Sequence, residues 1–252
     1  MIDLHAHVLP GVDDGPDSLE VSLEMLREAA AEGITVVAAT PHVRDDYPTS
    51  PETMERVLAE VRQAAAAAEI AVELLPGAEL DLEALRRLDD EALHRFGLGG
   101  NPRLLLLEFP YAGWPLELDD TVFRLSARGY TTVIAHPERN TAVQADPERL
   151  RSVVAAGAFV QITAASVDGR LGRHPQSTAT ALLETELAHL LASDAHAPAV
   201  RRGGLSAAVA SLGDEELGRW LVEDVPRALL AGAPPPARPE PAPRKRRFGR
   251  RR

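Results

Sequence analysis

The sequence predicts an α/β protein whose seven parallel strands and connecting helices close into a distorted, TIM-like (β/α)7 barrel. Short β-branched or leucine-rich runs alternate with longer helical patterns over about 230 of the 252 residues. This alternation indicates a parallel sheet, either closed into a barrel or open and doubly wound. Neither a GxGxxG motif nor a P-loop is present, which disfavours the open nucleotide-binding sheets and favours the barrel.

Each predicted strand is a short apolar run bounded by loop residues, and the predicted helices lie between the strands. In chain order, the predicted strands are Ile2–His7, Thr35–Ala39, Val72–Leu75, Leu104–Leu107, Thr132–Ala135, Phe159–Ile162 and Leu190–Ala192. The predicted helices are Ser18–Glu32, Pro51–Ala68, Leu82–His94, Leu116–Ala127, Pro147–Ala156, Gln176–Leu187, Leu205–Leu212 and Asp214–Leu230.

Local signals support several helix ends. Asp17 or Ser18 and the Asp146-Pro147 pair are typical of helix N-termini. Three glycines that each follow a helix and precede a strand are typical of helix C-termini: Gly33, Gly129 and Gly157.

The composition excludes several classes of protein. With 45% hydrophobic and 26% charged residues, the chain can bury a large core and is neither fibrous nor disordered. The chain has no cysteine, which excludes disulfides, thiolate metal sites and cysteine nucleophiles. No secretory signal is evident, and no apolar run approaches the roughly 18 residues of a membrane span. We therefore expect a soluble, cytoplasmic protein.

The charge of the chain is uneven. The net charge is −11, but residues 233–252 hold eight basic residues against one acidic residue, so residues 1–232 carry −18. An acidic body of this kind argues against nucleic-acid binding. We expect residues 1–232 to form the barrel and the Pro/Arg-rich residues 233–252 to be a disordered basic tail. This tail is either simply solvated or makes weak contact with an anionic membrane surface.

Histidines and carboxylates gather at the predicted strand ends. Six of the seven strands deliver His, Asp or Glu just after their last residues, where barrel enzymes place their active sites. His5 and His7 are two residues apart on a strand and therefore point to the same face. The residues concerned are His5, His7, Asp13, Asp14, His42, Glu79, Glu108, His136, Asp194 and His196.

These side chains are the nitrogen and oxygen ligands of Zn, Mn or Fe, so the sequence predicts a metal centre. Spacing from His7 cannot choose between Asp13 and Asp14. A dinuclear centre bridged by a carboxylated lysine is excluded, because the only lysine is Lys245 in the tail. The GxSxG motif of serine hydrolases and the EF-hand spacing are also absent.

The order of the motifs resembles the polymerase-and-histidinol-phosphatase (PHP) superfamily. Within it, the chain is most similar to the bacterial protein-tyrosine phosphatases of capsule and exopolysaccharide operons. The resemblance covers residues 1 to about 230 and rests on MIDLHAH at 1–7, GVDDGP at 11–16, TPH at 40–42, GAEL at 77–80, LLEFP at 106–110, HPERN at 136–140 and SDAH at 193–196.

The resemblance implies a distorted seven-stranded barrel with three divalent metal ions, expected to be Mn²⁺, with Fe or Zn as alternatives. It implies phosphate binding by Arg139 and Arg201, although the adjacent Arg202 makes the second assignment less specific. Val43 follows TPH where relatives often have another histidine, a difference that concerns the substrate more than the ligands. The implied metal ligands are His5, His7, Asp14, His42, Glu79, Glu108, His136, Asp194 and His196.

The resemblance also implies a reaction, the hydrolysis of a phosphate monoester by a metal-activated hydroxide. Four carboxylates contribute −4 and three divalent ions about +6, which matches a dianionic substrate. A metal-bound water can lose its proton near pH 7, and a phenolate with a pKa of about 10 leaves easily. The expected substrate is a phosphotyrosine protein, namely a membrane tyrosine kinase. Phe109, Tyr111 and Trp114 follow the fourth strand and either flank the phenyl ring or pack in the core.

Two alternatives stay open at the level of the sequence. One is a PHP phosphatase for a small molecule such as histidinol phosphate. The other is a non-catalytic metal-binding module that regulates a membrane kinase. The oligomeric state is not predicted.

Overall fold

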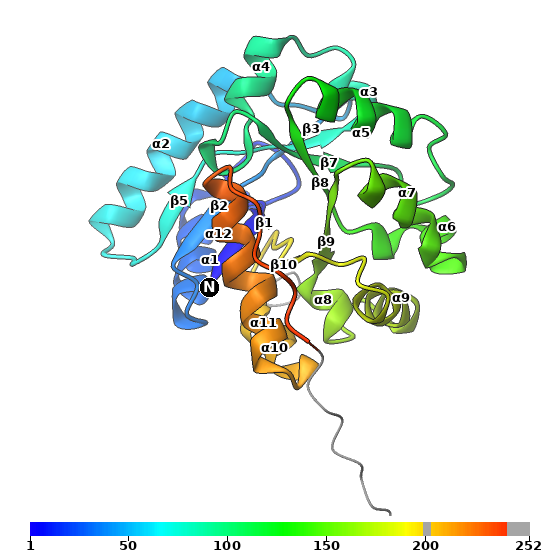
Figure 1. Cartoon of the computed structure of the whole chain (residues 1–252). Helices are drawn as coiled ribbons and strands as arrows, with labels where there is room; N and C mark the ends of the chain where they lie inside the picture. The colour runs from blue at the N-terminus through cyan, green and yellow to red at the C-terminus, as the bar shows by residue number, and fades with distance from the viewer. Residues whose placement is uncertain (199–202, 241–252) are drawn as a thin grey trace, which may run out of the picture.

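The computed structural model describes residues 1–198 and 203–240 (Figure 1). The seven predicted strands are all present, and each differs from its predicted range by no more than two residues at either end. They are β1 (Ile2–Ala6), β2 (Val36–Ala39), β5 (Glu73–Leu75), β7 (Leu104–Glu108), β8 (Thr131–Ile134), β9 (Phe159–Thr163) and β10 (Leu190–Ala192). Neighbouring strands of this set pair in parallel wherever they are hydrogen-bonded.

Two of these strands continue past a bend as short strands that the sequence did not predict. Pro41 separates β2 from β3 (His42–Arg44), and Pro76 with Gly77 separates β5 from β6 (Glu79–Asp81). The strands therefore form two hydrogen-bonded sheets. The three-stranded sheet has the order β1-β2-β5, and the seven-stranded sheet has the order β10-β9-β8-β7-β6-β3-β4. β4 (Tyr47–Pro48) returns antiparallel to β3.

Backbone hydrogen bonds close the sheet between its first and last strands. The Asp194 N–H donates to the His5 carbonyl and the His7 N–H donates to the Ala195 carbonyl, both at 2.8 Å. Together with the bent strands, these bonds produce a distorted seven-stranded barrel. The predicted fold class is confirmed. The bends are the source of the distortion. Before the bends, β2 pairs with β5 in the first sheet, and after the bends their continuations β3 and β6 pair in the second sheet.

Helices surround the strands (Figure 1), so most strand residues are buried, and most of these are apolar. The capping predictions mostly hold. Ser18 accepts a hydrogen bond from the Val21 N–H at the start of α1, and Gly33, Gly129 and Gly157 have φ of +85°, +80° and +104°. The longer helices before β10 are α1 (Leu19–Ala31), α2 (Pro51–Ala67), α5 (Leu118–Ala127) and α9 (Arg173–Glu184), and α7 (Leu150–Ala155) is a short one.

The helix predicted over Leu82–His94 is instead two short helices, α3 (Leu82–Leu85) and α4 (Asp90–Arg95). Asp89 lies between them, and its carboxylate accepts a hydrogen bond from the Ala92 N–H, so a new helix begins there. Two further short helices were not predicted, α6 (Thr141–Ala145) and α8 (Ala164–Val167). Across the described ranges, no helix combines the length and apolar character needed to cross a lipid bilayer.

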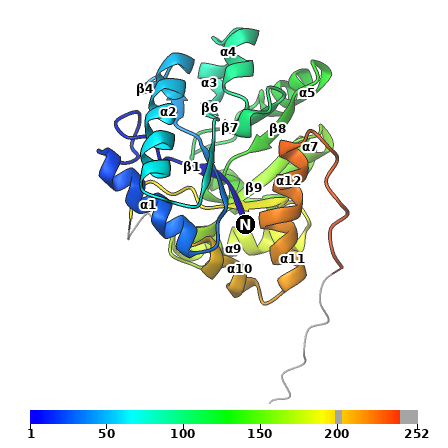
Figure 2. The same ribbon diagram turned by 90° about the vertical axis from the view of Figure 1, so that its left-hand side faces the viewer.

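The C-terminal helices pack beside the start of β1. They are α10 (Leu205–Leu212), α11 (Glu215–Arg219) and α12 (Val225–Leu230), with a π-helical turn over Trp220–Asp224 between the last two. Figures 1 and 2 both place the N-terminus next to α12. The N-terminal ammonium lies 3.4 Å from the Glu223 carboxylate, which ties the two ends of the barrel domain together.

Residues 233–240, the first part of the predicted tail, make hydrogen bonds to the barrel. The Trp220 indole donates to the Pro236 carbonyl at 3.0 Å. The Arg238 guanidinium donates to the carbonyls of Leu183 and Ala188 at 2.8 and 2.9 Å. The Arg238 contacts join residues 50 and 55 positions apart in the sequence, so local composition did not reveal them. The remainder of the predicted tail, residues 241–252, lies outside the described residues.

His189, just before β10, carries a pH-dependent contribution to stability. Its ring lies 3.2 Å from the donating Val160 N–H, and burial together with Arg238 lowers its pKa from 6.5 to about 4. The unfolded state therefore binds the extra proton between these two values, and this residue lowers the free energy of unfolding as pH falls through that window. In denaturant titrations at several pH values, the free energy of unfolding should fall more steeply with decreasing pH for the native chain than for His189→Gln. Parallel curves would contradict this prediction.

Candidate metal centre

The nine predicted ligands lie together at the carboxyl ends of the strands. His5, His42, Glu79 and Glu108 are on strands, whereas the others follow a strand or lie in the loop after β1. All are buried except Asp14 and Asp194, which are partly exposed. They form four overlapping groups, and within each group the ligand atoms lie within 4.8 Å of one another: His7, Asp14, His42 and His196; His5, Glu79 and His136; His5, His7 and Asp194; and His42, Glu79 and Glu108.

Glu79 occupies the middle of the cluster. Its Oε1 lies 2.7 Å from His136 Nε2, and its Oε2 lies 2.9 Å from His42 Nδ1. The same Oε2 is 3.3 Å from the Nε2 atoms of both His5 and His7. One carboxylate at the start of β6 thus reaches four imidazoles from three segments of the chain, a position that suits a ligand shared between ions.

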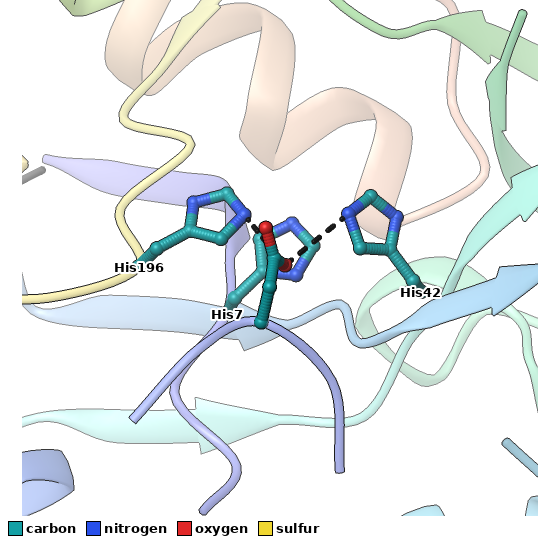
Figure 3. A group of neighbouring side chains, drawn as sticks. His7, His42 and His196 are labelled. Carbon is teal, nitrogen blue, oxygen red and sulfur yellow. Dashed lines mark ion pairs between the residues drawn. The ribbon is translucent and has the colours of Figure 1, made fainter. Parts of the chain in front are cut away.

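Asp14 lies between two histidines at the outer side of the cluster. Its Oδ1 is 3.2 Å from His196 Nε2 and 3.5 Å from His42 Nε2. Figure 3 shows His7, His42 and His196 converging on this point from three segments. The His7 and His196 rings are stacked with their centroids 3.9 Å apart.

Asp13 has a different place from Asp14. Its Oδ2 is 2.6 Å from His7 Nδ1 and accepts the His42 backbone N–H at 2.9 Å, while its Oδ1 accepts the Gly15 N–H. Asp13 therefore fixes the His7 ring with Nε2 directed toward Glu79, in the way that carboxylates orient metal-binding imidazoles. The sequence alone could not separate the two aspartates, because they are adjacent in one loop.

The HPERN segment holds Arg139 against the cluster. Glu138 is fully buried and accepts the Thr163 N–H and the Ser166 hydroxyl at 2.9 and 2.6 Å. Asn140 donates to the Pro110 and Gly113 carbonyls, both at 2.7 Å, which ties the segment to the loop after β7. Between these anchors, Arg139 Nη1 donates to Asp194 at 2.6 Å.

Two of the predicted ligands have unusual backbone conformations. His136 has φ +33° and Asp194 has φ +52°, and residues other than glycine adopt this left-handed region of the backbone only rarely. Each residue follows the last residue of a strand by two positions, so the turn aims its side chain back over the strand ends. Strained conformations of this kind are frequent at functional sites.

The electrostatics of the cluster favour bound positive charge. Burial alone would lower the pKa of His5, but the Glu79 and Asp194 carboxylates outweigh it and raise the pKa to about 9. Burial alone would raise the pKa of Asp194, but His5, His136 and other cations lower it to about 2. Burial and the neighbouring Glu79 raise the pKa of Glu108. Carboxylates this close together repel one another unless a cation or a shared proton lies between them, and a divalent cation would relieve this repulsion.

The residues fit divalent ions. Among the described residues, Glu79 Oε2 and His42 Nδ1 are buried polar atoms that make no hydrogen bond, although they lie 2.9 Å apart. Buried polar atoms without hydrogen bonds are costly unless another partner, such as a metal ion, satisfies them. Imidazole and carboxylate together are the donor set of Mn, Fe and Zn.

Other residues singled out in the sequence are placed as follows. Phe109 and Trp114 pack against each other, with ring centroids 5.9 Å apart, and belong to the core or its margin. Tyr111 is 43% exposed, and the Arg139 guanidinium lies 4.5 Å from its ring centroid. Arg201 lies outside the described residues. Arg44 was not predicted, yet its Nη1 lies 3.5 Å from Glu108.

Comparison with known families agrees with this geometry. Residues 1–227 match the family described as capsular polysaccharide synthesis, CpsB/CapC. The chain belongs to the CpsB/CapC family. It is 32% identical over 254 residues to the tyrosine-protein phosphatase YwqE of Bacillus subtilis, with 99% of each chain covered. It is 29% identical over 204 residues to the tyrosine-protein phosphatase CpsB of Streptococcus pneumoniae, covering 78% of this chain and 83% of that protein.

Solved structures give the same result for this CpsB/CapC member. One from a study of YwqE and CpsB, described there as unique metal-dependent tyrosine phosphatases, superposes with a TM-score of 0.84 at 30% identity. That match covers 97% of this chain and 100% of the other. A resiniferatoxin-binding protein from Rhodobacter sphaeroides, with a TM-score of 0.58 and 16% identity, shares the fold alone.

Proposed function

We propose that this protein is a metal-dependent tyrosine-protein phosphatase of capsule or exopolysaccharide synthesis. The observation that carries the proposal is the buried cluster around Glu79, with the Arg139 guanidinium beside it. Its membership of the CpsB/CapC family and its similarity to YwqE support the reaction and the substrate class.

The nine clustered residues would hold the ions, and we propose three ions, with Mn²⁺ as the physiological metal. When bound, divalent ions would lower the pKa of a water molecule to about 7 and neutralise charge on the phosphate. Four carboxylates and three divalent ions sum to about +2, the charge that matches a phosphate monoester dianion.

Arg139 would bind the non-bridging phosphate oxygens. Its guanidinium already lies 2.6 Å from Asp194 at the edge of the cluster, so it can reach an anion held there. Arg201 is proposed as the second phosphate-binding arginine from the family resemblance. Asp14 and His42, at the outer side of the cluster, would stand closest to the attacking water and orient it.

Tyr111 would contact the substrate's phenyl ring. Its exposed ring is stacked against the Arg139 guanidinium at 4.5 Å and lies 5.7 Å from the His136 ring. A phosphotyrosine whose phosphate reaches Arg139 would therefore bring its own ring to Tyr111. Aromatic contacts of this kind contribute roughly 0.5–1.5 kcal/mol beyond the area they bury.

We further propose a membrane tyrosine kinase as the substrate and the cytoplasm as the place of action. Such a substrate would sit near the membrane, where the basic residues between 244 and 252 could contact anionic lipid. These points rest on the family resemblance and the composition of the chain.

A metal-depletion experiment tests the proposed function. Treatment with a chelator should abolish hydrolysis of a phosphotyrosine peptide, and added Mn²⁺ should restore it, because the ions supply the charge that the arginines alone do not. Side-by-side kinetics should give a much higher kcat/KM for the peptide than for histidinol phosphate. The reverse preference would indicate a small-molecule phosphatase, and the absence of metal-dependent turnover would indicate a binding module.

A further inference from the structure

The β3–β4 hairpin carries a second arginine–tyrosine pair at the cluster. His42 and Arg44 are two residues apart on β3, so both side chains point to the face where the metal-binding groups lie. In this antiparallel hairpin, Arg44 lies opposite Tyr47 and Val43 lies opposite Pro48.

Three contacts fix the position of Arg44. Its Nε and Nη2 bind the two carboxylate oxygens of Asp46 at 2.7 and 3.1 Å. This bidentate contact directs Nη1 inward, where it lies 3.5 Å from Glu108 Oε2. A contact of 3.5 Å is long for a charge-assisted hydrogen bond, so Nη1 can exchange this partner for a closer anion.

Tyr47 completes the pair. The Arg44 guanidinium lies 5.2 Å from its ring centroid, and the ring stacks on His42 with centroids 5.8 Å apart and planes 15° apart. Arg139 and Tyr111 form a similar arginine–tyrosine pair, and the Tyr111 ring likewise contacts a proposed metal ligand, His136. The cluster is therefore bordered by two cation–aromatic pairs, one from the β3–β4 hairpin and one from the segments that follow β7 and β8.

We propose that Arg44 and Tyr47 are a second substrate-binding element, which rests on the proposed function. Arg44 Nη1 would bind a phosphoryl oxygen of the substrate, and the Tyr47 ring would pack against the phenyl ring or the adjoining peptide. Asp46 is a positioning residue in this arrangement, because it orients the guanidinium without reaching the cluster itself. The specificity for phosphotyrosine then depends on both pairs.

Binding of inorganic phosphate tests the role of Arg44 separately from turnover. In calorimetric titrations of the Mn²⁺-loaded protein, Arg44→Ala should weaken phosphate binding by about 10-fold or more, the loss expected for one charge-assisted contact. Arg44→Lys should recover part of this affinity. Arg56→Ala is the matched control, since Arg56 is an exposed arginine paired with Glu60 on α2. Bound manganese and the melting temperature should stay at native values in all three variants.

Kinetics on a phosphotyrosine peptide test Tyr47. Tyr47→Ala should raise KM several-fold with little change in kcat or in phosphate affinity, and Tyr47→Phe should behave as the native chain does. The proposal is overturned if Arg44→Ala binds phosphate with native affinity. It is also overturned if Arg44→Ala loses bound manganese, because Arg44 would then only support the metal ligand Glu108. If the native protein binds phosphate through Arg44 but hydrolyses no phosphotyrosine peptide, the proposed function fails while the anion site stands.

Discussion

Replacing Glu79 with glutamine is expected to lower phosphatase activity by at least about 1000-fold, or about 4 kcal/mol of transition-state stabilisation. Glu79 belongs to two of the four ligand groups, and its Oε2 lies within 3.3 Å of nitrogen atoms on His5, His7 and His42. Glutamine has the same shape but no charge and only one oxygen. Steady-state kinetics and elemental analysis of the same sample should show activity and bound metal falling together.

Glu73→Gln provides the control for this variant, because Glu73 is an exposed glutamate on β5, the strand that leads into β6. It should keep native activity and native metal content. A Glu79→Gln protein that retains both would show that the centre of the cluster is not a metal site.

Replacing His136 with alanine is expected to abolish hydrolysis of p-nitrophenyl phosphate while the fold stays intact. His136 Nε2 lies 2.7 Å from Glu79, and its ring is 5.7 Å from Tyr111, so it joins the ligand cluster to the proposed substrate side. The substitution removes a proposed ligand without disturbing any strand. Circular dichroism should match the native chain, and activity should be absent at saturating Mn²⁺.

The positive φ of His136 makes a second variant useful. Alanine is strained at φ +33°, whereas asparagine tolerates this region, so His136→Asn separates backbone strain from loss of the imidazole. Both variants should be inactive. His174→Ala, at an exposed position on α9, should be fully active. Full activity in His136→Asn would remove this residue from the mechanism.

Much of the architecture was predictable because it follows from local patterns. The leucine run of β7 and the alternation of strands with amphipathic helices indicate a barrel without any knowledge of contacts. The convergence of His5, Glu79 and Asp194 also follows, because parallel strands deliver their carboxyl ends to one edge. The order of the motifs then pointed to a family that the comparisons confirm.

The features that the sequence did not reveal depend on long-range geometry. The bends at Pro41 and Pro76 arise where a strand changes neighbours, which no local pattern reports. Arg238 looked like part of a solvated tail because its carbonyl partners lie about 50 positions away. Arg44 was not singled out in the sequence, since only the hairpin places it beside Glu108.

The most direct test of the account is a crystal structure of the Mn²⁺-loaded protein with anomalous data collected at the manganese edge. The account predicts three anomalous peaks among His5, Glu79, Asp194 and their six neighbours in the cluster, each within coordinating distance of the nitrogen and oxygen atoms described above. Manganese bound only elsewhere, in crystals of a protein that still hydrolyses phosphotyrosine, would contradict it.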